Sequence, residues 1–228
     1  MMLNRRWLVV INLMVILLLN GCIFYSTKPN EIGVRTKKIG FFVSKGIDPD
    51  IYAPGSTYIF LPFVNDWHTF NTNIQNMEMT AQIAKGDLFG QDDIKFKTID
   101  GNDISLDLII SYRILPEKAP YVLAYVASSD LELRTKIVRV ITRSLPRDIF
   151  GELRTEEFYT AELRAEKSEK AKTYLNAILE PYGVIVERVL TKDYRFNNQY
   201  QQAIEDKKIA DQQTEKLRSE VLAKQEEY

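Results

Sequence analysis

Short apolar or alternating runs separated by turn residues fill the chain from Ile32 to Ile114. Such runs, rich in β-branched and aromatic residues, are typical of strands. Met77 and Met79 are expected on the buried face of their strand. Asp100-Gly101 is expected to form a tight hairpin turn, because Gly accepts positive φ. The predicted strands are 32–34, 39–43, 57–61, 74–81, 96–99 and 104–114.

After Pro116 the apolar spacing lengthens to three and four residues, which predicts helices. A short helix is expected over 119–126. The next should begin with a capping box of Ser129 and Glu132 and end at Pro146. We expect it to bury Leu133, Ile137, Ile141 and Leu145.

A long amphipathic helix is predicted from Thr155 to Glu180, followed by a strand at 184–190. These strands and helices together give an α+β fold, with an antiparallel β layer covered by amphipathic helices. The inner stripe of the long helix is expected to hold Phe158, Ala161, Ala165, Ser168, Ala171, Leu175, Ile178 and Tyr182.

From Gln199 onward Gln, Glu, Lys and Ala dominate and Gly and Pro are absent, which predicts one polar helix. Ala203, Ala210 and Leu217 recur every seven residues, although Lys224 breaks the repeat. So thin an apolar stripe gains little from packing on its own domain. We therefore expect these three residues to mediate oligomerisation with copies of the chain.

The residues before the strands predict a membrane anchor of one of two kinds. Trp7 to Leu19 is uncharged and follows two arginines, but as a helix it spans only about 20 Å and resembles a secretory signal. Cys22 after Gly21 resembles the lipidated cysteine of a bacterial lipoprotein. Extension of the run through Tyr25 would instead suffice for a spanning helix. Both anchors remain open.

Orientation follows from the basic start of the chain. The positive-inside rule places Arg5 and Arg6 in the cytoplasm and the bulk of the chain on the periplasmic side. The inner membrane is favoured over the outer. Three segments are expected: a signal or anchor at 1–28, a main domain at 29–195 and a helical tail at 196–228.

Composition excludes several function classes. The net charge is −1, whereas nucleic-acid binding selects for clustered positive charge. One cysteine and one histidine leave no Cys/His metal-binding pattern. His68 lies outside any nucleophile motif, and the carboxylates of loop 85–93 lack the spacing of a calcium loop, so a solvated turn is expected there. We predict neither an enzyme nor a cofactor.

The ordered segments resemble the stomatin/prohibitin/flotillin family, also called the band 7 or SPFH domain, over about residues 29–213. The motifs that carry the resemblance are Glu31-Ile32-Gly33-Val34, Ala53-Pro54-Gly55, Leu61-Pro62-Phe63, Thr98-Ile99-Asp100-Gly101-Asn102, Leu106 to Ile114, Tyr182-Gly183-Val184 and Ala203 to Lys207.

The resemblance implies a non-enzymatic scaffold, tethered to membrane lipid, that assembles into large rings or cages. It also implies partnership with a related band 7 protein and with a membrane-bound AAA protease whose access to substrates is restrained. No small-molecule substrate or nucleic acid is implied. The rival interpretation is a lipoprotein of the cell envelope that binds a ligand or partner without large assemblies.

Overall fold

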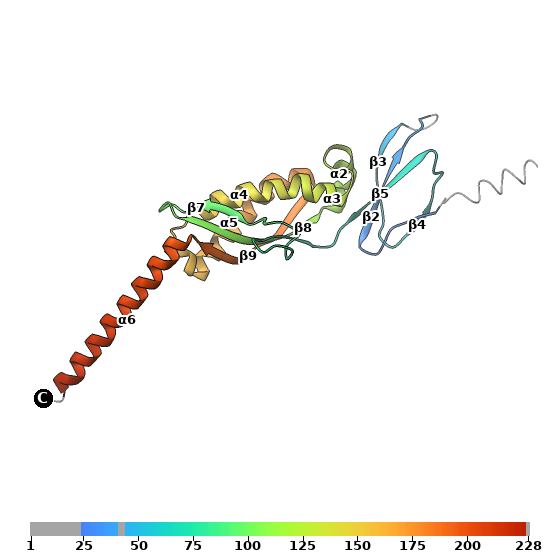
Figure 1. Ribbon diagram of the computed structural model, residues 1–228. Helices are drawn as coiled ribbons and strands as arrows, with labels where there is room; N and C mark the ends of the chain where they lie inside the picture. Colours follow the sequence, from blue (N-terminus) through green and yellow to red (C-terminus); the bar gives the residue numbers. More distant parts are fainter. Residues whose placement is uncertain (1–23, 41–43, 227–228) are drawn as a thin grey trace, which may run out of the picture. The chain divides into compact units, whose positions relative to one another are not determined.

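A computed structural model describes residues 24–40 and 44–226 of the chain. They form two compact units whose segments interleave along the sequence (Figure 1). The first unit holds the described residues up to Met77, with Ile110–Thr142 and Lys172–Arg188. The second unit holds Glu78–Ile109, Arg143–Ala171 and Val189 onward.

Five strands build the N-terminal part of the first unit in two antiparallel sheets. The strand β2 lies between β3 and β5 in one sheet, and β1 pairs with β4 in the other. The bounds are β1 Phe24–Ser26, β2 Glu31–Lys37, β3 Gly46–Tyr52, β4 Thr57–Ile59 and β5 Asn65–Asn71.

The sequence prediction missed three of these strands, β1, β3 and β5. Residues 38–40 are not in a strand and 41–43 lie outside the described residues, so the predicted strand 39–43 is not observed. Instead the partner of β2 is β3, whose centre is polar. Its Asp48 is only 3% exposed and accepts a hydrogen bond from Arg35 Nε at 2.9 Å. A cation on the neighbouring strand thus compensates a carboxylate that breaks the apolar pattern.

Trp67 of β5 is the centre of an aromatic cluster that fills the space between the two sheets. Its ring centre lies 5.1 Å from that of Tyr52 and 5.6 Å from that of Phe60. Phe70 of the same strand is fully buried. Trp67 itself is half-buried. His68, between them, lies opposite Val34 of β2.

Gly33 lies directly beneath the Trp67 ring. A Cβ atom at Gly33 would stand 2.1 Å from Cζ2 of Trp67 and 2.2 Å from its Cη2, so any side chain there would collide with the ring. The glycine in the Glu31-Ile32-Gly33-Val34 motif is therefore required by close packing of an aromatic residue on the β2 backbone.

A third sheet is built around β8, with which β6, β7 and β9 all pair. The predicted hairpin is confirmed: Lys97 of β7 pairs with Asp103 of β8, and Gly101 in the turn has φ of 85°. Met77 and Met79 are fully buried, as predicted. The bounds are β6 Gln75–Met79, β7 Ile94–Lys97, β8 Asp103–Ile114 and β9 Val184–Phe196.

Helical segments follow β8, and the short predicted helix at 119–126 is confirmed as α2. The bounds are η1 Pro116–Lys118, α2 Ala119–Tyr125, α3 Asp130–Glu132, η2 Leu133–Val138, α4 Arg139–Gly151, η3 Glu156–Tyr159, α5 Ala161–Leu179, η4 Glu180–Tyr182 and α6 Asn198–Glu226.

The helix that begins at Asp130 contains one π turn, which changes its buried stripe. Ser129 accepts a hydrogen bond from the backbone N–H of Glu132 at 3.3 Å, which confirms the Ser129 half of the predicted capping box. The Glu132 side chain instead accepts from the backbone N–H of Ser128, at 2.9 Å. The π turn η2 then inserts an extra residue. As a result the stripe passes from Leu133 to Val138 and Thr142, while the predicted Ile137, Ile141 and Leu145 are only half-buried.

The prediction that this helix ends at Pro146 is wrong, because Pro146 lies inside α4 and the helix continues to Gly151. Proline in a helix interior costs about 3 kcal/mol. The continuation buries Ile149 and Phe150, and each such side chain contributes about 1.5–3 kcal/mol. Burial of these two residues offsets the missing backbone hydrogen bond.

The long helix predicted from Thr155 is divided. The backbone of Thr160 is extended, so a 3₁₀ turn, η3, precedes α5. The buried stripe of α5 is Ser168, Ala171, Leu175 and Leu179, which leaves the predicted Ala161, Ala165, Ile178 and Tyr182 exposed. Because the helix is interrupted at Thr160, Phe158 does not belong to the stripe of α5, and its side chain is fully buried from the separate turn η3.

Loop 85–93 is not wholly a solvated turn, as had been predicted. Asp92 and Asp93 are 2% and 5% exposed. Asp92 accepts a hydrogen bond from Arg143 at 2.7 Å, and Asp93 accepts one from the Ser105 hydroxyl at 2.6 Å. These carboxylates therefore anchor the end of the loop to the second unit.

Candidate functional site

The tail helix α6 is a single polar helix of 29 residues, drawn in red in Figure 1, and it begins at a side-chain cap. Asn197 Oδ1 accepts a hydrogen bond from the backbone N–H of Tyr200 at 2.8 Å. Asparagine is among the best helix N-caps because its side chain satisfies an otherwise unpaired N–H. This cap allows α6 to start directly after β9.

An aromatic cluster holds the base of α6 to the second unit. The ring centre of Phe196 lies 5.4 Å from that of Tyr159, 5.6 Å from that of Tyr194 and 5.3 Å from that of Tyr200. The guanidinium of Arg164 stands 5.1 Å from the Tyr194 ring centre, within cation–π range. Burial raises the pKa of both the Tyr159 and Tyr200 hydroxyls.

The first turns of α6 also form one wall of a groove. A cavity of about 290 Å³ lies between α6 and η3. Its apolar surface comes from Tyr159 and Ile204, and Lys208 Nζ stands 5.9 Å from the Tyr159 ring centre. The charged residues around it have both signs. The lining residues are Glu156, Tyr159, Ile204, Lys207, Lys208 and Asp211.

A buried ion pair fixes the end of β9, from which α6 departs. Asp107 of β8 is fully buried, and Arg195 of β9 donates to both its carboxylate oxygens, at 3.0 Å and 2.6 Å. Thr80 donates to Asp107 at 2.6 Å. Burial opposes ionisation of Asp107, but the hydrogen bonds from Arg195 and Thr80 outweigh it, so the pKa of Asp107 is lowered.

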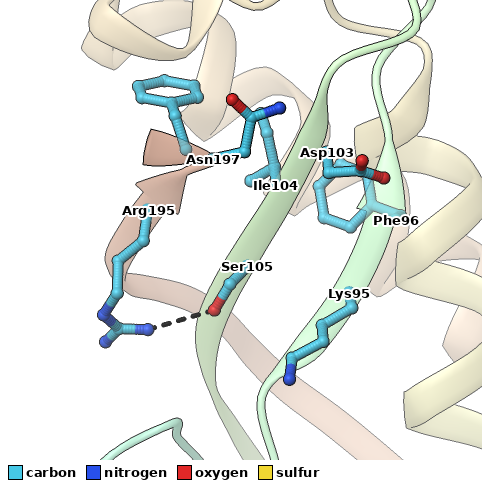
Figure 2. A pocket seen from close by; sticks show the side chains of 8 residues that line it. Lys95, Phe96, Asp103, Ile104, Ser105, Arg195 and Asn197 are labelled. Atoms are coloured by element: carbon cyan, nitrogen blue, oxygen red, sulfur yellow. Dashed lines mark hydrogen bonds between the residues drawn. The ribbon is translucent and has the colours of Figure 1, made fainter. Parts of the chain in front are cut away.

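A second cavity, of about 270 Å³, lies beside this ion pair (Figure 2). Ser105 lines it and donates its hydroxyl hydrogen to Asp93 at 2.6 Å while it accepts from Arg195 Nη1 at 3.1 Å. The Ser105 hydroxyl therefore bridges a carboxylate and a guanidinium. These two hydrogen bonds connect Ser105 of β8 to the end of loop 85–93 and to β9.

The predicted oligomerisation residues lie together on one exposed side of α6. Ala203, Ala210 and Leu217 are all exposed, and Leu217 retains 61% of its accessible surface. Ile204 is the half-buried residue that faces the groove. The predicted stripe is thus not used to attach α6 to its own unit and is available to other molecules.

Residues 1–23, which hold Cys22 and the apolar run from Trp7 to Leu19, lie outside the described residues. The predicted extension of a spanning helix through Tyr25 is wrong, because Phe24 and Tyr25 lie in the strand β1. Among residues 24–40 and 44–226, no helix is both long and apolar enough to cross a bilayer. The same part of the chain holds no group of three His, Cys, Asp or Glu residues arranged to bind a metal ion.

Sequence reasoning missed the Asp107–Arg195 pair and the aromatic base of α6. Asp107 occupies a polar position in the alternating run 104–114, and this pattern alone does not indicate a partner. The sequence does carry a signal for the aromatic base. Three aromatic residues, Tyr194, Phe196 and Tyr200, lie close together at the start of the polar tail, and so many are unusual for a segment that is fully exposed.

Comparisons with known proteins agree with this architecture. A comparison with curated proteins finds no match. The sequence profile described as SPFH domain / Band 7 family matches residues 25–227. This match extends over most of the chain, including strands of all three sheets and the described tail, and the protein therefore belongs to the SPFH domain / Band 7 family.

Proposed function

We propose that this protein is a membrane-tethered scaffold that assembles with copies of itself into large rings or cages and so organises a region of membrane. It belongs to a family of non-enzymatic, membrane-associated scaffolds. The observation that carries the proposal is the exposed stripe of Ala203, Ala210 and Leu217 on α6. A helix whose base is fixed and whose apolar side faces solvent is suited to contacts between subunits.

Tethering makes weak contacts sufficient for assembly. A molecule held on a bilayer moves in two dimensions, so the effective concentration of neighbouring copies rises. Contacts between different surfaces of successive copies close into a ring when their rotation allows. In this arrangement the stripe of one copy meets a different surface of the next.

The tether itself is proposed from the residues before Phe24. Either a membrane helix that ends before the strand β1 or acyl chains on Cys22 would hold the chain on the membrane. The basic residues Arg5 and Arg6 favour a periplasmic location for the main domain and an inner-membrane site. The mass of the mature N-terminus distinguishes a chain that starts at a lipidated Cys22 from one that starts at Met1.

The proposed partners are membrane lipid, a related band 7 protein and a membrane-bound AAA protease. A closed wall of scaffold around such a protease would restrain the access of its substrates. The alternative function is a cell-envelope lipoprotein that binds a ligand or partner as a small species. The groove of Glu156, Tyr159 and Ile204 is the feature that favours this alternative.

Replacement of Ala210 and Leu217 by Asp is expected to break large particles into small species while the domain stays folded. Each carboxylate would be buried without a partner in the contact, which is strongly unfavourable. The matched control is Gln212→Asp, on the nearly opposite side of α6 and also exposed. Particle size in mild detergent is the measurement, with circular dichroism as the folding check.

Three outcomes are informative. Small species for the double variant and large particles for Gln212→Asp support assembly through the stripe. Unchanged large particles for the double variant would refute the role of α6. Small species for the unsubstituted chain would refute the scaffold and favour the lipoprotein alternative.

A further inference from the structure

Residues 82–91, in the connection between β6 and β7, form a loop whose backbone is held by hydrogen bonds. The N–H of Ala84 donates to the carbonyl of Phe89 at 3.1 Å, and the N–H of Asp87 donates to the carbonyl of Glu78 at 3.2 Å. Ala84 has a φ of 62°. This left-handed conformation is unfavourable for a residue with a Cβ atom, and it persists only where the surrounding structure imposes it. The loop therefore has one defined shape.

This loop presents large apolar side chains to solvent. Ile83, Leu88 and Phe89 are 62%, 42% and 81% exposed. The hydrogen bond between residues 84 and 89 brings the two ends of the loop together, so the three side chains are displayed from one small segment. We call residues 82–91 the apolar loop. Grouped apolar exposure of this kind marks an interaction surface.

The groove at the base of α6 has matching chemistry and lies in the same unit as the apolar loop. Tyr159, which is 49% exposed, and Ile204 form its apolar surface. Its rim carries both carboxylates and lysines. The apolar loop likewise carries Lys85 and Asp87 between its apolar residues. Docking of the loop in the groove would therefore bury apolar surface and leave charges of opposite sign close together.

The apolar loop does not fill the groove of its own chain, since Phe89 keeps 81% of its accessible surface. Two complementary surfaces on one chain permit a head-to-tail contact between successive copies. The groove also adjoins the stripe proposed for assembly, because Ile204 follows Ala203 and lies about 100° from it around α6. A second copy of the chain is therefore the partner that these two surfaces fit.

We propose that the apolar loop of one copy docks into the groove at the base of α6 of the neighbouring copy, with Phe89 against Tyr159 and Ile204. This contact rests on the assembly of the proposed function and adds a second attachment to that of the stripe. The groove is then a contact between subunits, and no separate ligand is needed to fill it.

The test places a photo-crosslinking residue in the full-length chain, in the membranes of the cells that express it. One variant carries p-benzoylphenylalanine in place of Phe89. The control carries it in place of Leu190, which is 44% exposed on β9 of the same unit. After irradiation, products are separated by mass and digested with trypsin, and the linked peptides are identified. The groove residues Tyr159 and Ile204 lie in the tryptic peptides 155–164 and 196–207.

The expected product of the position 89 variant is a crosslinked dimer of the chain in which the probe is joined to peptide 155–164 or 196–207. The control is expected to give no dimer joined through these peptides. The proposal would be overturned by a dimer joined elsewhere, by a link within one chain, by a link to a different protein or by no link at all. Equal yields of the groove-linked dimer from both variants would overturn it as well.

Particle size in mild detergent, measured on the same samples before irradiation, tests the proposed function separately. If the position 89 variant forms large particles but gives no link to the groove, only the loop contact fails. If it forms small species with the link, the large assembly fails and the loop contact stands. If it forms small species without the link, both fail.

Discussion

Replacement of Arg195 by methionine is expected to lower the free energy of unfolding at pH 7 by about 3–5 kcal/mol. The variant keeps the fully buried Asp107 carboxylate but removes the guanidinium that donates two hydrogen bonds to it. Thr80 and the N–H of Ala81 still donate to Asp107, yet neither carries a charge to offset its burial. Chemical denaturation followed by circular dichroism measures the loss.

The pH dependence of this loss identifies its cause. In the unsubstituted protein the pKa of Asp107 is lowered in the folded state, so its contribution is complete above the unfolded pKa of about 3.9 and is lost as pH falls through the folded value. In the variant, burial without Arg195 raises the folded pKa above the unfolded one. Protonation then relieves the buried charge, so the difference between the two proteins shrinks as pH falls from 7 to 5.

Arg188→Met is the control, because Arg188 is an exposed arginine on the same strand. Its effect is expected to stay within about 0.5 kcal/mol and to be independent of pH in this range. An equal loss in both variants would show that β9 is sensitive to any lost arginine, and a pH-independent loss in Arg195→Met would exclude the buried charge as its origin.

Gly33→Ala is expected to lower the free energy of unfolding by about 1–3 kcal/mol, because the added methyl group collides with the Trp67 ring. The ring must move away from β2, and the packing of Tyr52 and Phe60 against it must change as well. Denaturation measures the free-energy change, and a red shift of the tryptophan emission reports displacement of the ring.

Gly90→Ala is the matched control, because no atom lies within 4 Å of the position its Cβ would take. It is expected to be neutral or to stabilise by a few tenths of a kcal/mol through lower entropy of the unfolded chain. A Gly33→Ala variant as stable as Gly90→Ala, with unchanged emission, would show that the cluster accommodates the methyl group without strain.

The features that were predicted correctly from the sequence are determined by residues adjacent to one another in the chain. The Asp100-Gly101 turn, the Ser129 cap and the buried faces of Met77 and Met79 each follow from a few adjacent residues. The polar tail helix follows in the same way from local helix propensity.

The features that it missed depend on residues far apart or on small changes of helix geometry. Arg195 and Asp107 are separated by 88 positions, and nothing near either residue identifies the other. The strand β3 was missed because Asp48 interrupts its apolar pattern and is compensated only by Arg35 on β2. A single π turn was enough to move the buried stripe from Ile137 to Val138.

The aromatic base of α6 has a consequence for the geometry of the proposed assembly. Contact between Phe196 and Tyr200 and the Asn197 cap oppose bending of the tail where it leaves β9. The direction of α6 is therefore the same in each copy before assembly. In the proposed assembly this direction sets the angle between neighbouring copies, and so the curvature of the ring or cage. Substitutions that weaken the packing of Phe196 or Tyr200 would then allow this angle to vary. The copies would still assemble, but into closed particles of different circumferences.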